Sequence, residues 1–354
     1  MRLSGYTTIR NAKSMGYPFI ESIKSMLSFC DEVVVLDSSD DTVTSQALDD
    51  LAEQEPKLIV IEADIPWDAP NHGIYDGQSK AMARLECTGD VCWQMDADEI
   101  VHEDHGPAIR NMAEKLFSFA TSTTGYPADP VPLIALPVIE FWGPDKIRTD
   151  INFWKPRLSL NLPKITHGIP ASHLKVEDGR IYAKHGTDGC DYIWKDTMEP
   201  VPVRFLSYGI GRVTEKMHEF MQNPTKFQEE IVAEAMESTV NENPGVYHYS
   251  WYSIPEKILK YKHFWNDSWK SLYNENRDPN WNPFINKSLN DMTEREIIEL
   301  GTELETKTGG WIFHQKWDGS RRPSLSLEIA SRYGINHPAI SKEWREQVDA
   351  KKKQ

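Results

Sequence analysis

The stretch Val91-Cys92-Trp93-Gln94-Met95-Asp96-Ala97-Asp98-Glu99-Ile100-Val101 places three carboxylates within four positions, directly after a short apolar run. The apolar run has the length and bulk of a buried strand, and acids at the carboxyl end of such a strand lie where open α/β sheets bind ligands. Asp96 and Asp98 would point the same way if the extended backbone continued. Two like charges that close repel, so either a hard divalent cation lies between them, or the acids cap a helix or form a solvated turn.

The residues upstream alternate between short apolar strands and amphipathic helices. Strands are predicted at residues 5–9, 31–37, 57–61 and 91–95, and helices at 18–27, 42–54 (capped by Thr42) and 76–87. This alternation predicts an α/β fold with a mostly parallel sheet and right-handed crossovers.

The residues downstream predict a mixed extension of that sheet, followed by helices. Strands are expected at 133–141 and 147–160 after a helix at 106–120, and helices at 254–272 and 292–308 before a frayed, solvated helix at 341–354. We therefore expect a catalytic α/β domain at residues 1–212, with a donor half at 1–105 and an acceptor half at 106–212. Residues 213–354 are expected to form a mainly helical C-terminal region.

The composition of the chain restricts its partners. Its 39 Lys and Arg against 54 Asp and Glu give a formal net charge of −15, which argues against nonspecific binding to nucleic acid or to anionic membranes. No apolar run approaches the roughly 18 residues of a membrane span, and the N-terminus has no signal-peptide pattern. The four cysteines form no CxxC pair, so we expect reduced thiols and a cytoplasmic protein.

Four motifs follow one another, each separated by a strand-helix unit. They are Thr8-Ile9-Arg10-Asn11, then Val34-Val35-Leu36-Asp37-Ser38-Ser39-Asp40-Asp41-Thr42, then Gly77-Gln78-Ser79-Lys80, and finally Gly89-Asp90 with Asp96-Ala97-Asp98-Glu99. In this order the first 105 residues or so resemble the GT-A glycosyltransferases, specifically the family-2-like group. The resemblance implies a metal-dependent transfer of a sugar from a nucleoside-diphosphate donor, UDP- or GDP-linked, to a hydroxyl of a glycan, a lipid-linked or another acceptor.

The resemblance also implies a nucleotide site at the strand ends. Its candidate residues are Thr8, Arg10, Asn11, Asp37, Lys80 and Asp96. Asp37 would accept hydrogen bonds from the base or ribose, whereas Arg10 and Lys80 would bind the diphosphate unless they form salt bridges with neighbouring acids.

The resemblance assigns the acids of the opening stretch to a DXD motif that holds Mn²⁺ or Mg²⁺. Asp98 would bind the metal and Asp96 the ribose, the metal or both, with Glu99 supporting from outside. His248 would add a ligand from far along the chain, unless it packs among aromatic residues at a domain junction. No zinc-type cluster of His and Cys is visible.

Inverting transfer needs a general base, for which the candidates are Glu140, Asp188 and Asp191. Asp191 ranks first because it precedes the hydrophobic Tyr192-Ile193-Trp194, but each acid is also compatible with a solvated turn. We expect inversion, although the missing base motif leaves retention open. Residues 165–173, with Trp142 and Trp154, would line an acceptor cleft or form a packed turn region.

Two other functions compete with sugar transfer. A sugar-1-phosphate nucleotidyltransferase would need a Gly-rich loop after the first strand, which Arg10-Asn11-Ala12-Lys13-Ser14-Met15-Gly16 is not. A non-catalytic nucleotide- or carbohydrate-binding module on the same fold would bind these ligands without turnover.

Overall fold

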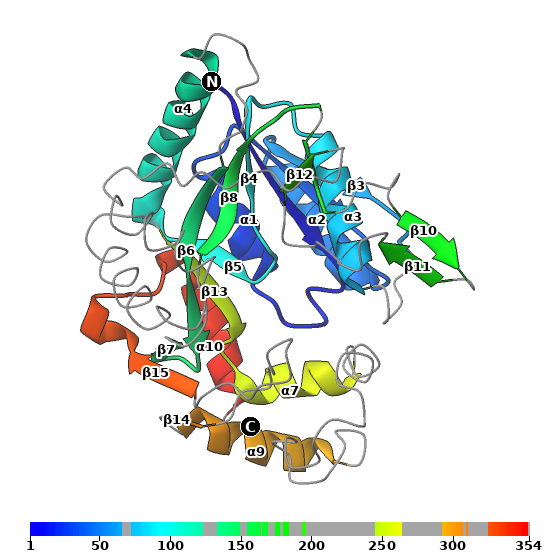
Figure 1. Ribbon diagram of the computed structural model, residues 1–354. Helices are drawn as coiled ribbons and strands as arrows, with labels where there is room; N and C mark the ends of the chain where they lie inside the picture. The colour runs from blue at the N-terminus through cyan, green and yellow to red at the C-terminus, as the bar shows by residue number, and fades with distance from the viewer. Residues whose placement is uncertain are drawn as a thin grey trace.

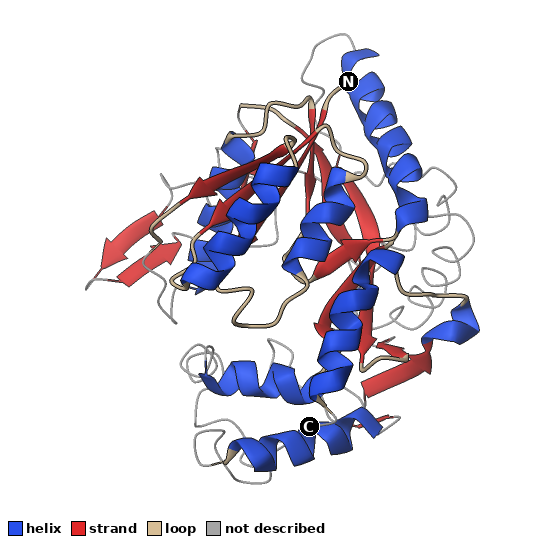
Figure 2. Ribbon diagram, turned by 180° about the vertical axis from the view of Figure 1, so that it is seen from behind, coloured by secondary structure: helices blue, strands red, loops and turns tan. Residues whose placement is uncertain are grey.

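The computed structural model describes twelve segments of the chain: residues 1–65, 72–122, 133–148, 154–163, 165–168, 174–177, 180–183, 193–195, 245–263, 292–306, 309–310 and 325–352. These residues form an α/β fold in which helices flank one large twisted sheet (Figures 1 and 2). Eleven strands join this sheet within the described part.

The first four strands are parallel and lie in the order β3-β2-β1-β4. They are β1 (Leu3–Ile9), β2 (Glu32–Asp37), β3 (Leu58–Glu62) and β4 (Val91–Gln94), connected by α1 (Phe19–Leu27), α2 (Thr42–Gln54) and α3 (His72–Leu85). All of β2 is buried: Val33 and Val35 pack into the core with α1 and α2, while Val34 and Leu36 pack with α3 on the other face. A strand covered on both faces accounts for its continuous apolar run.

The sheet continues as a mixed extension. β8 (Trp154–Leu160) is antiparallel to β4, and β6 (Leu133–Trp142), β7 (Lys146–Arg148), β15 (Leu325–Ile329) and β14 (Gly309–Gly310) follow, each antiparallel to its neighbour. The predicted α/β class, mostly parallel with a mixed extension, is confirmed. The single strand expected at 147–160 is instead parts of two strands, β7 and β8.

The C-terminal part of the chain contributes strands to this sheet as well as helices. β13 (Val246–Trp251) lies between β6, to which it is parallel, and β5 (Glu99–Val101), to which it is antiparallel. Its helices are α7 (Ile254–His263), α9 (Glu294–Thr306) and α10 (Lys342–Lys351). The domain boundary expected near residue 212 lies outside the described residues and stays a prediction.

The remaining elements are short, apart from one helix beside the sheet. They are η2 (Glu103–His105), α4 (Gly106–Ser122), the pair β9 (Ile165–His167) and β12 (Ile193–Lys195), the hairpin β10 (Leu174–Glu177) and β11 (Arg180–Ala183), η6 (Ala330–Tyr333) and η7 (Ala339–Ser341). None of the helices in the described segments is long and apolar enough to cross a membrane.

Two helix starts differ from the prediction. The helix expected to begin at Asp76 begins at His72, so the Gly77–Lys80 motif lies inside α3 instead of opening it. The N-cap of α2 is Asp41 and not Thr42, because Asp41 is extended and its carboxylate accepts a hydrogen bond of 2.7 Å from the Thr44 amide.

The C-terminal helix is docked on the domain, so the prediction of a frayed, solvated helix was wrong. Trp344 donates its indole N–H to the Gly16 carbonyl at 3.2 Å and packs edge-on against Tyr249 at 5.5 Å. The Tyr252 hydroxyl donates to Asp349 at 3.2 Å. The helix thereby connects the loop after β1 to the end of β13.

A buried carboxylate joins the starts of β1, β2 and β4. Glu32 is 3% exposed and accepts hydrogen bonds from Ser4 Oγ (2.5 Å), the Thr88 amide (2.6 Å) and Arg2 Nη2 (2.7 Å). Burial alone would raise the pKa of Glu32, but these hydrogen bonds lower it from 4.5 to about 2.

Because its folded pKa is depressed, Glu32 should stabilise the fold fully above pH 4.5 and lose this effect as the pH falls toward 2. Glu32→Gln should therefore lower the free energy of unfolding by about 1–3 kcal/mol at pH 7 and by less at pH 3. Urea unfolding at both pH values measures this, with the exposed Glu53→Gln as control. An equal loss at the two pH values would contradict the prediction.

Candidate functional site

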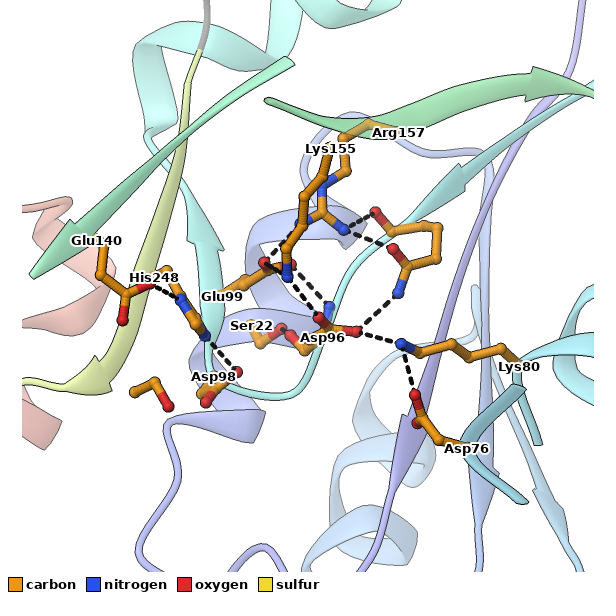
Figure 3. Close-up of polar contacts among 12 residues, drawn as sticks. Ser22, Asp76, Lys80, Asp96, Asp98, Glu99, Glu140, Lys155, Arg157 and His248 are labelled. Carbon is orange, nitrogen blue, oxygen red and sulfur yellow. Dashed lines mark hydrogen bonds and ion pairs between the residues drawn. The ribbon is translucent and has the colours of Figure 1, made fainter. Parts of the chain in front are cut away.

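The acidic motif lies on a turn, not on extended backbone. β4 ends at Gln94, after which the Glu99 amide donates to the Asp96 carbonyl at 3.1 Å and the Asp96 amide donates to Glu99 Oε2 at 2.9 Å. The expectation that Asp96 and Asp98 point the same way was therefore wrong. The turn directs the two carboxylates to separate groups of partners (Figure 3).

Asp96 lies among basic side chains. Lys80 Nζ is 3.0 Å from its Oδ1 and Lys155 Nζ is 3.3 Å from its Oδ2, while Gln94 Nε2 donates to Oδ1 at 2.9 Å. Lys80, itself buried, also pairs with Asp76 at 3.0 Å. Burial favours the neutral acid, but Lys80, Lys155 and Arg157 outweigh it and hold the pKa of Asp96 well below its usual range.

Glu99 and Arg157 form a fully buried ion pair behind the motif. Arg157 Nη2 lies 2.5 Å from Glu99 Oε1, and Arg157 Nη1 donates to the Gln94 side chain and to its carbonyl. Lys155 Nζ is also 3.5 Å from Glu99 Oε1. Glu99 was expected to support the motif from outside, but it lies in the interior, where Arg157 on β8 compensates its charge (Figure 3).

Asp98 meets His248 from β13. His248 Nε2 is 3.3 Å from Asp98 Oδ1, and its Nδ1 contacts Glu140 Oε2 on the adjacent strand β6. The Tyr249 amide donates to the Asp98 carbonyl at 2.8 Å, which fixes the motif against β13. Although burial favours the neutral ring, Glu140 and Asp98 raise the pKa of His248 to about 10, and His248 lowers the pKa of Asp98.

Asp98 and His248 fit a divalent cation, because their carboxylate and imidazole converge and both are acceptable ligands of Mn²⁺. Asp96 fits less well, since both of its oxygens are engaged by lysines. Within the described segments no group of three His, Cys, Asp or Glu is arranged to hold a metal. A cation at this pair would therefore need oxygens from a phosphate or water, as is usual for Mg²⁺.

Two nucleotide-site candidates determine the shape of the loop after β1. Asn11 adopts a left-handed φ of 50°, which Asn tolerates, and its side-chain oxygen accepts from the amides of Asp40 (2.7 Å) and Asp41 (3.1 Å). Arg10 pairs with Asp40 at 3.0 Å, so it forms the salt bridge that was its alternative role. Both side chains thus join the β1 loop to the β2 loop.

The other candidates at this edge are Asp37 and Thr8. Asp37 is buried at the end of β2 and accepts from the Ser39 amide (3.0 Å) and from Ser45 Oγ (2.6 Å). Thr8 is partly buried near the end of β1. Contacts of these residues with a nucleotide stay predictions.

The expected acceptor cleft is not formed by the described residues. Trp142 is 1% exposed and stacks on Trp251 at 5.1 Å, and His167 is buried with Nδ1 2.8 Å from the Tyr6 hydroxyl. Gly168 packs so closely that a Cβ there would lie 2.5 Å from the Gly77 Cα. Trp142, His167 and Gly168 are therefore buried, while residues 169–173 of the expected cleft lie outside the described residues.

Some expectations lie outside the described residues. Asp188 and Asp191 fall there, as does the side chain of Trp154. Sequence reasoning missed Lys155 and Arg157, although two cations spaced two apart in an apolar strand face the same side and, once buried, require acidic partners.

Fold and site together define an open α/β protein whose charged groups gather at the carboxyl ends of parallel strands. No family model matches the chain, and no curated protein matches it. Among solved structures, S. aureus TarS 1–349 is 13% identical with a TM-score of 0.33, the match covering 82% of this chain and 70% of that one. The same protein in complex with UDP-GlcNAc is 14% identical with a TM-score of 0.33, over 86% of this chain and 90% of that one.

A third similar structure is GalNAc-T7 with UDP, GalNAc and Mn²⁺. It is 16% identical with a TM-score of 0.26, over 39% of this chain and 23% of that one. TM-scores this low reflect loose superposition and do not assign a function.

Arg157→Met should destabilise the protein by about 3–5 kcal/mol, because it leaves the Glu99 carboxylate buried without its main partner. Replacing both residues, with Arg157→Met and Glu99→Leu, should restore part of this loss. Urea unfolding of the wild type, both single variants and the double variant measures the coupling. Additive losses would show that the two side chains do not stabilise each other.

Proposed function

We propose that this chain is a nucleotide-sugar glycosyltransferase that binds its donor at the carboxyl ends of β1, β2 and β4. The observation that carries the proposal is the meeting of Asp98 and His248 at 3.3 Å, beside the Asp96 group of cations. The two residues are far apart in the sequence, yet β13 brings them together at the strand ends where open sheets bind ligands.

Asp98 and His248 would hold Mn²⁺ or Mg²⁺. When bound, the cation stabilises the negative charge that develops on the nucleoside diphosphate leaving group. Lys80 and Lys155 would turn from Asp96 toward phosphate oxygens, and Asp96 would then be released to contact the ribose or the metal. Thr8, Asn11 and Asp37 would contact the base and ribose of a UDP- or GDP-sugar, and Arg10 would turn from Asp40 toward its diphosphate.

We assign Glu140 a positioning role in place of the general base. Its carboxylate contacts His248 Nδ1, which leaves Nε2 directed at Asp98, the arrangement common for metal-binding histidines. The acceptor hydroxyl would then be deprotonated by another acid, for which Asp191 and Asp188 remain the candidates, and inverting transfer is expected with such a base.

Asp98→Ala should abolish Mn²⁺-dependent binding of UDP or GDP and donor turnover, because it removes the carboxylate that faces His248. Asp96→Asn should weaken nucleotide binding and retain the Mn²⁺ dependence. Calorimetry with each nucleotide, with and without Mn²⁺, and a hydrolysis screen across nucleotide sugars check both, with the exposed Asp49→Ala as control. Full Mn²⁺-dependent binding in Asp98→Ala would refute the metal assignment. If the protein binds a nucleotide sugar but neither hydrolyses any donor nor transfers sugar to any acceptor, the result would favour a non-catalytic binding module.

Glu140→Gln should weaken Mn²⁺ binding roughly 10- to 100-fold, as loss of a carboxylate behind a metal-binding His usually does. The imidazole ¹⁵N shifts of His248 should move at the same time, because its Nδ1 partner has changed. A purely structural role would lower the melting temperature and leave the affinity for Mn²⁺ unchanged.

A further inference from the structure

A pair of lysines on α7 lies beside the candidate metal site. Lys257 and Lys260 are three residues apart, so they share one face of the helix. Both interact electrostatically with Asp98, and Lys257 also with Glu140. In a chain with a net charge of −15, this face is a local concentration of positive charge.

The loop after β1 holds the two ammonium groups against an aromatic ring. Lys260 Nζ lies 4.0 Å from the centre of the Tyr17 ring, and Lys257 Nζ lies 6.0 Å from it. Lys257 also donates to Ser250 Oγ and lies over Trp251 at 5.6 Å. Contacts with ring faces restrain the ammonium groups, and the carboxylates that act on them are those of Asp98, Glu140 and Glu256.

Keeping these charges together costs free energy. Lys257 is 8% exposed. Burial lowers the pKa of Lys260 to about 7, with a further contribution from Lys257, while Asp98 and Glu256 act in the opposite direction. A bound anion would relieve both the burial and the mutual repulsion, and lysine ammonium groups commonly bind phosphate.

We propose that Lys257 and Lys260, held against Tyr17, form a phosphate-binding subsite next to Asp98 and His248. The site lies between α7 and the loop after β1 (Figure 1), where both lysines face the ring of Tyr17. The source of the phosphoryl group rests on the proposed function. It is either the diphosphate of the donor or a phosphate on the acceptor.

The test measures pyrophosphate and inorganic phosphate binding to the full chain by calorimetry in EDTA, so that no divalent cation contributes. Lys260→Met and Lys257→Met should each weaken binding about tenfold or more, because each removes one charge-assisted contact. Lys24→Met, which removes an exposed lysine on α1, should leave it unchanged. If Lys257→Met fails to fold, Lys260→Met still decides the result.

UDP and GDP distinguish the two sources. A parallel loss of nucleotide affinity in Lys260→Met assigns the subsite to the donor diphosphate. Unchanged nucleotide affinity, together with phosphate binding to the nucleotide complex of the wild type, assigns it to the acceptor. Wild-type affinity for both anions in a folded Lys260→Met variant would overturn the inference, whatever Asp98→Ala shows for the metal.

Discussion

The buried ion pair between Glu99 and Arg157 is the contact on which the geometry of the site depends. Two charges removed from water carry a large desolvation cost, and only close, well-directed contacts offset it. Glu99 meets this requirement by accepting from Arg157 with one oxygen and from the Asp96 amide with the other. The carboxylate whose charge Arg157 compensates therefore also closes the turn that directs Asp96 and Asp98 apart.

Much of the parallel half of the fold could be predicted because its signals are local. Four apolar residues between Glu32 and Asp37 indicate a strand covered on both faces, and Pro18 precedes the helix that returns the chain. The acids at the ends of β2 and β4 then had to lie at one edge, because parallel strands share their direction. Helix starts were less certain, since a cap depends on one backbone angle, as Asp41 shows.

The rest of the site depends on pairings between distant segments. The position of His248 follows from the entry of β13 between β5 and β6, which no local pattern indicates. The directions of Asp96 and Asp98 depend on a turn closed by the side chain of Glu99, and that side chain depends on Arg157 from β8. Trp142 looked like a surface for a sugar ring because residue type alone does not distinguish an exposed indole from a buried one.

The charges around the two acids explain why they would act differently. On one side, Lys80, Lys155 and Arg157 face three carboxylates, those of Asp76, Asp96 and Glu99, so the formal charges balance. On the other side, Asp98 and Glu140 share His248, while Lys257 and Lys260 interact electrostatically with Asp98, and Lys257, Arg148 and Lys155 with Glu140. A metal-binding imidazole must be neutral, so a divalent cation at Asp98 and His248 would take the place of the imidazole proton as the positive charge that these side chains share. The group around Asp96, in which Lys80, Lys155 and Arg157 balance three carboxylates, can instead exchange a carboxylate for a phosphate without a large change in its net charge.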